Sequence, residues 1–167
     1  MEKGITKLSV SGFKSIAKET TLDNKPLTLL AGANSSGKSS FMQPLLLLKQ
    51  TLAAPFLPAP LLFSGANVNF TSFNQMLTCQ KGKSTIREFV VTLESSQNRQ
   101  TFAIPTRQIE LHENTIWIIK RMIHVSGLRG SPARIYPTAS VGPTFPGKFE
   151  NYTASMISHW EEKSRIS

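Results

Sequence analysis

The sequence GANSSGKSSF, residues 32–41, decides how the rest of the chain is interpreted. Residues 32–39 match the pattern G-x-x-x-x-G-K-[ST] at every fixed position. Such a loop needs glycines because several consecutive backbone N–H groups must turn toward one anion, which bulky side chains would prevent. We therefore expect residues 32–37, called here the glycine loop, to bind a phosphate group.

The residues on either side of the glycine loop support this interpretation. Residues 27–31 (LTLLA) form a short, continuously apolar run, which predicts a strand covered on both faces. From Lys38 to about Leu52 the apolar residues have helical spacing, with Pro44 expected to kink the helix or to confine its regular part to one side. A helix that begins at the loop adds its free N–H groups and its dipole to the same anion site.

The candidate ligand-binding residues follow from the motif. Lys38 would reach the β- and γ-phosphates of a nucleotide, and Ser39 would hold Mg²⁺ through its hydroxyl. Ser40 is a weaker candidate for the α-phosphate. The remaining candidates are Gly32, Asn34, Ser35, Ser36 and Gly37. The alternative is a glycine turn between a strand and a helix, followed by an unrelated lysine.

An acidic group that could complete a hydrolytic site is hard to find in the sequence. Hydrolysis by proteins with such a loop normally uses an aspartate at the end of an apolar strand to orient Mg²⁺. The single aspartate, Asp23, lies upstream of the loop in a polar stretch. Residues 89–94 (FVVTLE) are an apolar run ending in Glu94, but they lie in a predicted hairpin meander and read as an ordinary strand. The chain is thus expected to bind a nucleotide without completing the reaction unaided.

Length and composition set broad limits. With 167 residues, 40% of them apolar, the chain suits one domain or a piece of a larger one. A formal net charge of +9 favours an acidic partner such as a nucleotide or nucleic acid. The basic residues form no tail, so a solvated basic surface is an equal alternative.

Cysteine usage and the apolar segments bear on localisation. The one cysteine, Cys79, excludes an internal disulfide and suits a reducing compartment. The N-terminus lacks the features of a secretory signal, and prolines interrupt the most apolar region well before the roughly 20 residues that a membrane span needs. We expect a cytoplasmic protein.

The remaining segments are predicted to complete a single lobe. A strand is expected at residues 6–10, a linker at 55–84, and a loop rich in glycine and proline at 127–147. Residues 148–163 are predicted to form an amphipathic helix. Antiparallel strands are expected within residues 85–126, at 86–93, 101–104, 108–111 and 115–119.

Residues 12–16 and 32–40, each next to a predicted strand, resemble the N-terminal lobe of ABC/SMC-like ATPases. The AAA-type members related to the overcoming-lysogenization-defect nucleases and to prokaryotic defence ATPases look most similar. Residues 61–73 and 127–136 are also similar to segments of that group, so the resemblance covers most of residues 1–147. It implies an α/β P-loop NTPase fold, with a mixed sheet that includes an antiparallel meander.

The resemblance also implies a ligand and a mode of assembly. ATP with Mg²⁺ would be sandwiched between the glycine loop of one head and a signature motif of another, so a homo-oligomer or a partner subunit is expected. Lys14 and Ser15 would lie near the nucleotide, unless they form only a surface turn. Gln75 would be a candidate metal ligand. Arg129 and Arg134 would contact phosphate, DNA or a neighbouring subunit, or would hold their own loop together.

The sequence departs from the family where hydrolysis is concerned. No signature motif, no aspartate-glutamate pair after an apolar strand and no switch histidine is recognisable. We therefore expect the ATP-binding portion of an ABC/SMC-like ATPase of a DNA-related or anti-phage defence system, completed by a partner or by further sequence. The alternative is a non-enzymatic subunit through which nucleotide binding regulates a nuclease or toxin partner.

Overall fold

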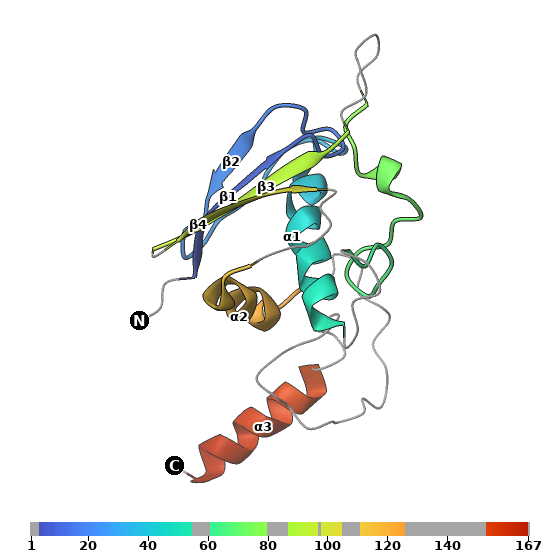
Figure 1. Cartoon of the computed structure of the whole chain (residues 1–167). Helices are drawn as coiled ribbons and strands as arrows, with labels where there is room; N and C mark the ends of the chain where they lie inside the picture. Colours follow the sequence, from blue (N-terminus) through green and yellow to red (C-terminus); the bar gives the residue numbers. More distant parts are fainter. Residues whose placement is uncertain are drawn as a thin grey trace.

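The computed structural model describes residues 4–54, 61–79, 87–96, 98–104, 111–125 and 153–166. A four-stranded antiparallel sheet has the order β2-β1-β3-β4, and helices α1 and α2 lie on one of its faces (Figure 1). In chain order the elements are β1 (Ile5–Ser11), β2 (Thr20–Asp23), α1 (Lys38–Ala53), the short 3-10 helix η1 (Phe73–Gln75), β3 (Phe89–Ser95), β4 (Arg99–Ile104), α2 (Glu113–Arg121) and α3 (Thr153–Ile166).

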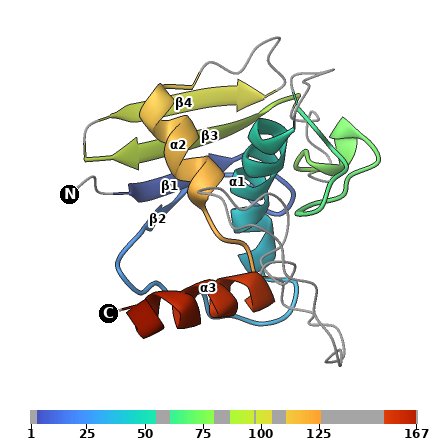
Figure 2. The same ribbon diagram turned by 90° about the horizontal axis from the view of Figure 1, so that it is seen from below.

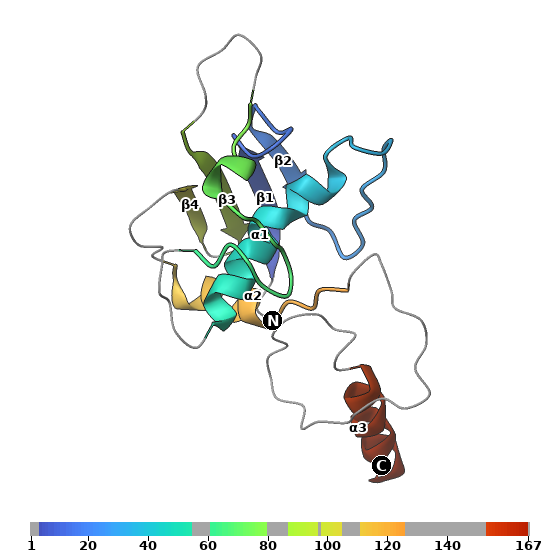
Figure 3. The same cartoon turned by 90° about the vertical axis from the view of Figure 1, so that its right-hand side faces the viewer.

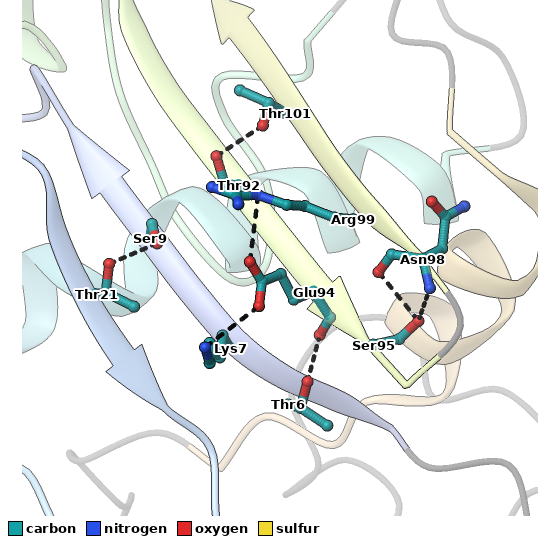
Figure 4. Close-up of polar contacts among 10 residues, drawn as sticks. All are labelled: Thr6, Lys7, Ser9, Thr21, Thr92, Glu94, Ser95, Asn98, Arg99 and Thr101. Atoms are coloured by element: carbon teal, nitrogen blue, oxygen red, sulfur yellow. Dashed lines mark hydrogen bonds and ion pairs between the residues drawn. The ribbon is translucent and has the colours of Figure 1, made fainter.

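The two faces of the sheet differ in chemistry because side chains alternate along each strand. Leu8 and Val10 of β1 are buried in the core under the helices. On the opposite face the hydroxyl of Ser9 bonds that of Thr21 at 2.7 Å, and similar hydroxyl pairs and ion pairs continue across the strands (Figure 4). An antiparallel sheet with one apolar, packed face and one polar face accounts for this pattern.

Helices α1 and α2 contact each other below the sheet, as Figure 2 shows. Lys49 of α1 is buried, and its Nζ donates to the backbone carbonyl of Lys120 in α2 at 3.3 Å. Burial lowers the pKa of the Lys49 ammonium, because desolvation disfavours the charged form. This contact ties the C-terminal half of α1 to the C-terminal end of α2.

Several predicted elements are confirmed. The strand expected at residues 6–10 lies within β1, and the β-rich runs at 86–93 and 101–104 overlap the paired strands β3 and β4. The helix expected from Lys38 is α1, and Pro44 lies buried inside it without ending it. The apolar face of α1 packs into the core, so tertiary packing offsets the hydrogen bond that proline removes.

The strand predicted at residues 115–119 is wrong, because these residues form the middle of α2. The His112 side chain accepts a hydrogen bond from the backbone N–H of Asn114 at 3.4 Å and thereby caps the helix. Glu113 lies in the first turn and Lys120 with Arg121 in the last, which suits the helix dipole. These end signals and the packing of the helix override the strand preference of the β-branched run.

The strand predicted at residues 27–31 is also wrong for the described chain. These residues have no regular secondary structure, and Leu27, Leu29 and Leu30 are 77%, 82% and 40% exposed. A buried strand needs hydrogen-bonding neighbours on its edges, and the described sheet ends at β2. The described strands are accordingly antiparallel throughout, whereas a mixed sheet was predicted.

The remaining predictions are met only in part by the described residues. Helix α3 covers most of the helix predicted at 148–163, and it lies apart from the sheet in Figures 1 and 3. Strand β2 was missed because its sequence, TTLD, reads as polar. The strand at 108–111 and the loop at 127–147 with Arg129 and Arg134 fall, apart from Leu111, outside the described residues.

Gln50 of α1 holds the chain segment that follows the helix. Its Oε1 accepts from the backbone N–H groups of Val68 at 2.9 Å and Asn67 at 3.3 Å, and its Nε2 donates to the carbonyl of Leu62. A Cβ on Gly65 would lie 2.8 Å from the same Oε1. The amide of Gln50 therefore joins α1 to residues 62–68.

Gln50→Ala is expected to lower the free energy of unfolding by about 2 kcal/mol, because it leaves buried backbone groups without partners. Urea denaturation of wild type and variant measures the difference. Gln75→Ala is the matched control, since Gln75 is exposed and its side chain, within the described residues, bonds Thr71 alone. That control should change stability by no more than about 0.5 kcal/mol. Equal losses in the two variants would contradict the role of Gln50.

Candidate functional site

The glycine loop leads directly into α1 through backbone conformations that favour glycine. Gly37 is the N-cap residue with φ of 94°, and Ser35 is also left-handed with φ of 63°. The backbone N–H of Phe41 bonds the carbonyl of Gly37 at 2.9 Å, which begins the helix. The first N–H groups of a helix have no partner within it, and Gly37 supplies no side-chain cap. The first backbone N–H groups of α1 therefore have no side-chain cap where the helix meets the loop.

Lys38 closes the glycine loop with its own side chain. Its Nζ donates to the carbonyls of Gly32 at 2.7 Å and Ala33 at 2.6 Å, and lies 3.4 Å from Oγ of Ser36. The ammonium charge is therefore held at the loop, next to the N-terminus of α1. A lysine charge and a helix N-terminus together form a favourable site for an anion.

A cavity of about 660 Å³ adjoins the glycine loop. Ser36, Gly37 and Lys38 line one part of it, and Leu29 and Leu30 line another. Its volume lies within the roughly 300–1,000 Å³ that is usual for small-molecule sites. The apolar side chains that the predicted strand would have buried therefore form a wall of this cavity.

Ser15 is the predicted residue that the structure brings to the loop. A Cβ placed on Gly37 would lie 2.8 Å from Oγ of Ser15, and Ser15 lines the cavity beside the loop. The turn that carries Ser15 is held by hydrogen bonds between the backbones of Phe13 and Ile16, and by Lys14 N–H to the carbonyl of Met76 at 2.8 Å. Gly37 thus needs glycine for two reasons, its positive φ and its contact with Ser15.

The side chain of Lys14 lies against aromatic rings. Its Nζ lies 4.7 Å from the ring centroid of Phe70 and 5.9 Å from that of Phe13. Desolvation lowers the pKa of this ammonium. Lys14 does not line the cavity beside the loop, so the structure does not bring its charge together with that of Lys38.

The other predicted ligands lie in different settings. Ser39 and Asn34 are exposed, and Ser40 is partly buried at the start of α1. Gln75 of η1 bonds Thr71 through both ends of its amide, with Nε2 to Oγ1 at 2.7 Å and Oε1 to the backbone N–H at 3.0 Å. Its role as a metal ligand stays a prediction.

The acidic candidates lie on the sheet. Glu94 near the end of β3 forms ion pairs with Lys7 at 3.6 Å and Arg99 at 3.2 Å, on the polar face drawn in Figure 4. Asp23 of β2 lies opposite Lys7 of β1 in the strand register and is exposed. Within the described residues no group of three or more His, Cys, Asp or Glu side chains could hold a metal ion.

Lys18 is a second cation at the site that sequence reasoning missed. It lines the cavity beside the loop together with Ile16, Ala17 and Thr20. Residues 16–18 lie between β1 and β2, and Thr20 begins β2. No motif marks these residues, because their position depends on how the turn at Phe13 packs. Charge near the glycine loop thus comes from two separate segments of the chain.

In the part of the chain that the structure describes, no helix combines the length and the apolar character that crossing a bilayer requires. Neither the family models nor the curated proteins contain a match to this chain.

Proposed function

We propose that the glycine loop and Lys38 bind the phosphates of ATP with Mg²⁺, and that the chain is the ATP-binding portion of an ABC/SMC-like ATPase. The observation that carries the proposal is the Lys38 ammonium, held 2.7 Å from the Gly32 carbonyl beside uncapped helix donors. An ammonium and free N–H groups at one point favour a multiply charged anion. The motif at residues 32–39 favours a nucleotide over other anions.

Different residues of the chain would contact the phosphates and the Mg²⁺ ion. Lys38 would exchange its contacts with the Gly32 and Ala33 carbonyls for phosphate oxygens, and Ser39 would offer its hydroxyl to Mg²⁺. The magnesium ion neutralises phosphate charge when it is bound. The cavity beside the loop supports a nucleotide rather than free phosphate, because its apolar wall suits a base or sugar.

The exposed leucines support completion of the site by a second polypeptide or by further sequence. Leu27 and Leu29 lie shortly before the loop and are largely exposed, and Leu30 is partly exposed. Exposing such an apolar run to water costs free energy, and pairing with another strand would remove that cost. We propose that a partner subunit or further sequence covers this run and contributes the acid for hydrolysis. The complete ATPase would belong to a cytoplasmic, DNA-related or anti-phage defence system.

A second function is favoured by the state of Glu94. Its carboxylate is already paired with Lys7 and Arg99, so it is poorly placed to bind Mg²⁺. In this alternative ATP is a ligand that gates association with a nuclease or toxin partner and is not hydrolysed. Phosphate release by the purified chain tests the gating role. ATP turnover that disappears in Ser39→Ala would argue against the gating role.

The binding proposal is tested by Gly37→Ala. Alanine at φ of 94° is strained by about 1–2 kcal/mol, and its Cβ would clash with Oγ of Ser15. Titration with ATP and Mg²⁺ should therefore show affinity at least about tenfold weaker than wild type. Gly4→Ala is the matched control, since nothing lies within 4 Å of its Cβ position, and it should bind as wild type does. Equal affinity of Gly37→Ala and wild type would contradict the proposal.

A further inference from the structure

A second cavity, of about 360 Å³, lies between the sheet and the helices. It shares no lining residue with the cavity beside the glycine loop. Apolar side chains from four elements line it: Leu8 of β1, Leu22 of β2, Met42 with Leu45 of α1, and Trp117 of α2. Figures 1 and 2 show α2 beside α1 under the sheet, which is the arrangement that encloses this space.

Among the described residues, one charged side chain lines the cavity, that of Arg121 at the end of α2. Its guanidinium lies 4.5 Å from the ring centroid of Trp117, which is itself 48% exposed. Among the described residues no carboxylate lies within ion-pairing distance of Arg121. The polar Asn24 is already engaged, because its Nδ2 donates to the carbonyl of Ile5 at 2.8 Å.

We propose that this cavity binds a monoanion with an unbranched apolar chain, of the medium-chain carboxylate class. The volume is within the roughly 300–1,000 Å³ range of ligand pockets, and the lining offers an apolar chain Leu22, Met42 and Leu45. A guanidinium matches a carboxylate with two parallel hydrogen bonds. A cationic head group would be repelled by Arg121, and an uncharged one would gain no charge-assisted bond.

Part of the cavity wall belongs to the helix that follows the glycine loop. Met42 and Leu45 lie in the first two turns of α1, the helix that begins at Lys38. The proposal does not depend on ATP binding, because the two cavities have separate linings. Lys38→Ala should therefore bind the carboxylate as wild type does, so failure of one proposal leaves the other testable.

Fluorescence of Trp117 tests the proposal directly. The chain has two tryptophans, so Trp160→Phe leaves Trp117 as the single reporter in the full chain. Titration with decanoate should shift its emission to shorter wavelength and saturate. Decanol, which has the same chain without the charge, should bind about tenfold more weakly, and decylamine more weakly still. Equal binding of all three compounds, or no spectral change with decanoate, would overturn the proposal.

Two charge variants made in the Trp160→Phe background identify the head-group contact. Arg121→Gln should remove the roughly tenfold preference for decanoate over decanol. Arg121 is exposed, so the change is compatible with folding. Lys120→Gln is the matched control, because it removes one charge from the adjacent exposed residue, which does not line the cavity. An undiminished preference in Arg121→Gln, or an equal loss in Lys120→Gln, would contradict the assigned site.

Discussion

Lys38→Ala is expected to weaken ATP binding about 100-fold, which corresponds to roughly 3 kcal/mol. The reason is that hydrogen bonds from a charged donor are worth more than neutral ones, and Lys38 carries the positive charge held at the loop. Isothermal titration of ATP with Mg²⁺ into wild type and variant measures the loss. The Lys38 side chain is partly exposed, so the variant should still fold.

The matched control for this prediction is Lys25→Ala, which removes the same charge from an exposed position before the loop. General electrostatic attraction of ATP to a chain of net charge +9 would weaken to a similar extent in both variants. A specific role for Lys38 requires that Lys25→Ala stay within about threefold of wild type, since a single surface charge contributes little. Comparable losses in the two variants would reject the glycine loop as the binding site.

Phe13→Ala is expected to lower the free energy of unfolding by about 3–5 kcal/mol. Phe13 is fully buried, with its ring centroid 5.0 Å from that of Phe89 and 6.2 Å from that of Phe70, both in edge-to-face geometry. Truncation leaves a cavity where the turn after β1 packs on β3. Urea denaturation followed by circular dichroism measures the change.

Phe63→Ala provides the comparison for Phe13→Ala, because Phe63 is a phenylalanine that is only partly buried and packs on Phe73 at 6.3 Å. The decrease in the free energy of unfolding in Phe63→Ala should be about half of that in Phe13→Ala, in proportion to the apolar area that each ring removes from water. A smaller loss in Phe13→Ala than in Phe63→Ala would contradict the central position of this ring.

The elements that sequence alone could predict are those with strong local signals. Helix α1 combines a motif, a glycine at its start and a long apolar face, and β1 alternates apolar and polar residues. The strand prediction for residues 115–119 is wrong because their β-branched side chains favour a strand, whereas the cap at His112 and the packing of the helix stabilise α2. The strand prediction for residues 27–31 is wrong because a buried strand needs adjacent strands to pair with, and a local sequence pattern does not show whether they are present.

The same distinction applies to the candidate site. The order Gly37-Lys38-Ser39 is a local pattern, so the glycine loop could be found from the sequence. Where the ammonium of Lys14 lies could not be predicted, because its contact with Phe70 joins residues far apart in the chain. Lys18 reaches the cavity for a similar reason, through the packed turn between β1 and β2.

Amide chemical shifts test the central claim most directly, because they report on the backbone groups of the glycine loop themselves. In an ¹⁵N-labelled sample titrated with ATP and Mg²⁺, the largest chemical-shift changes are expected at the amides of residues 32–40. These changes should saturate as ATP is added, and they should be absent in Lys38→Ala. Amides of residues 32–40 that stay unchanged at saturating ATP, or shifts that are largest elsewhere in the chain, would contradict the account.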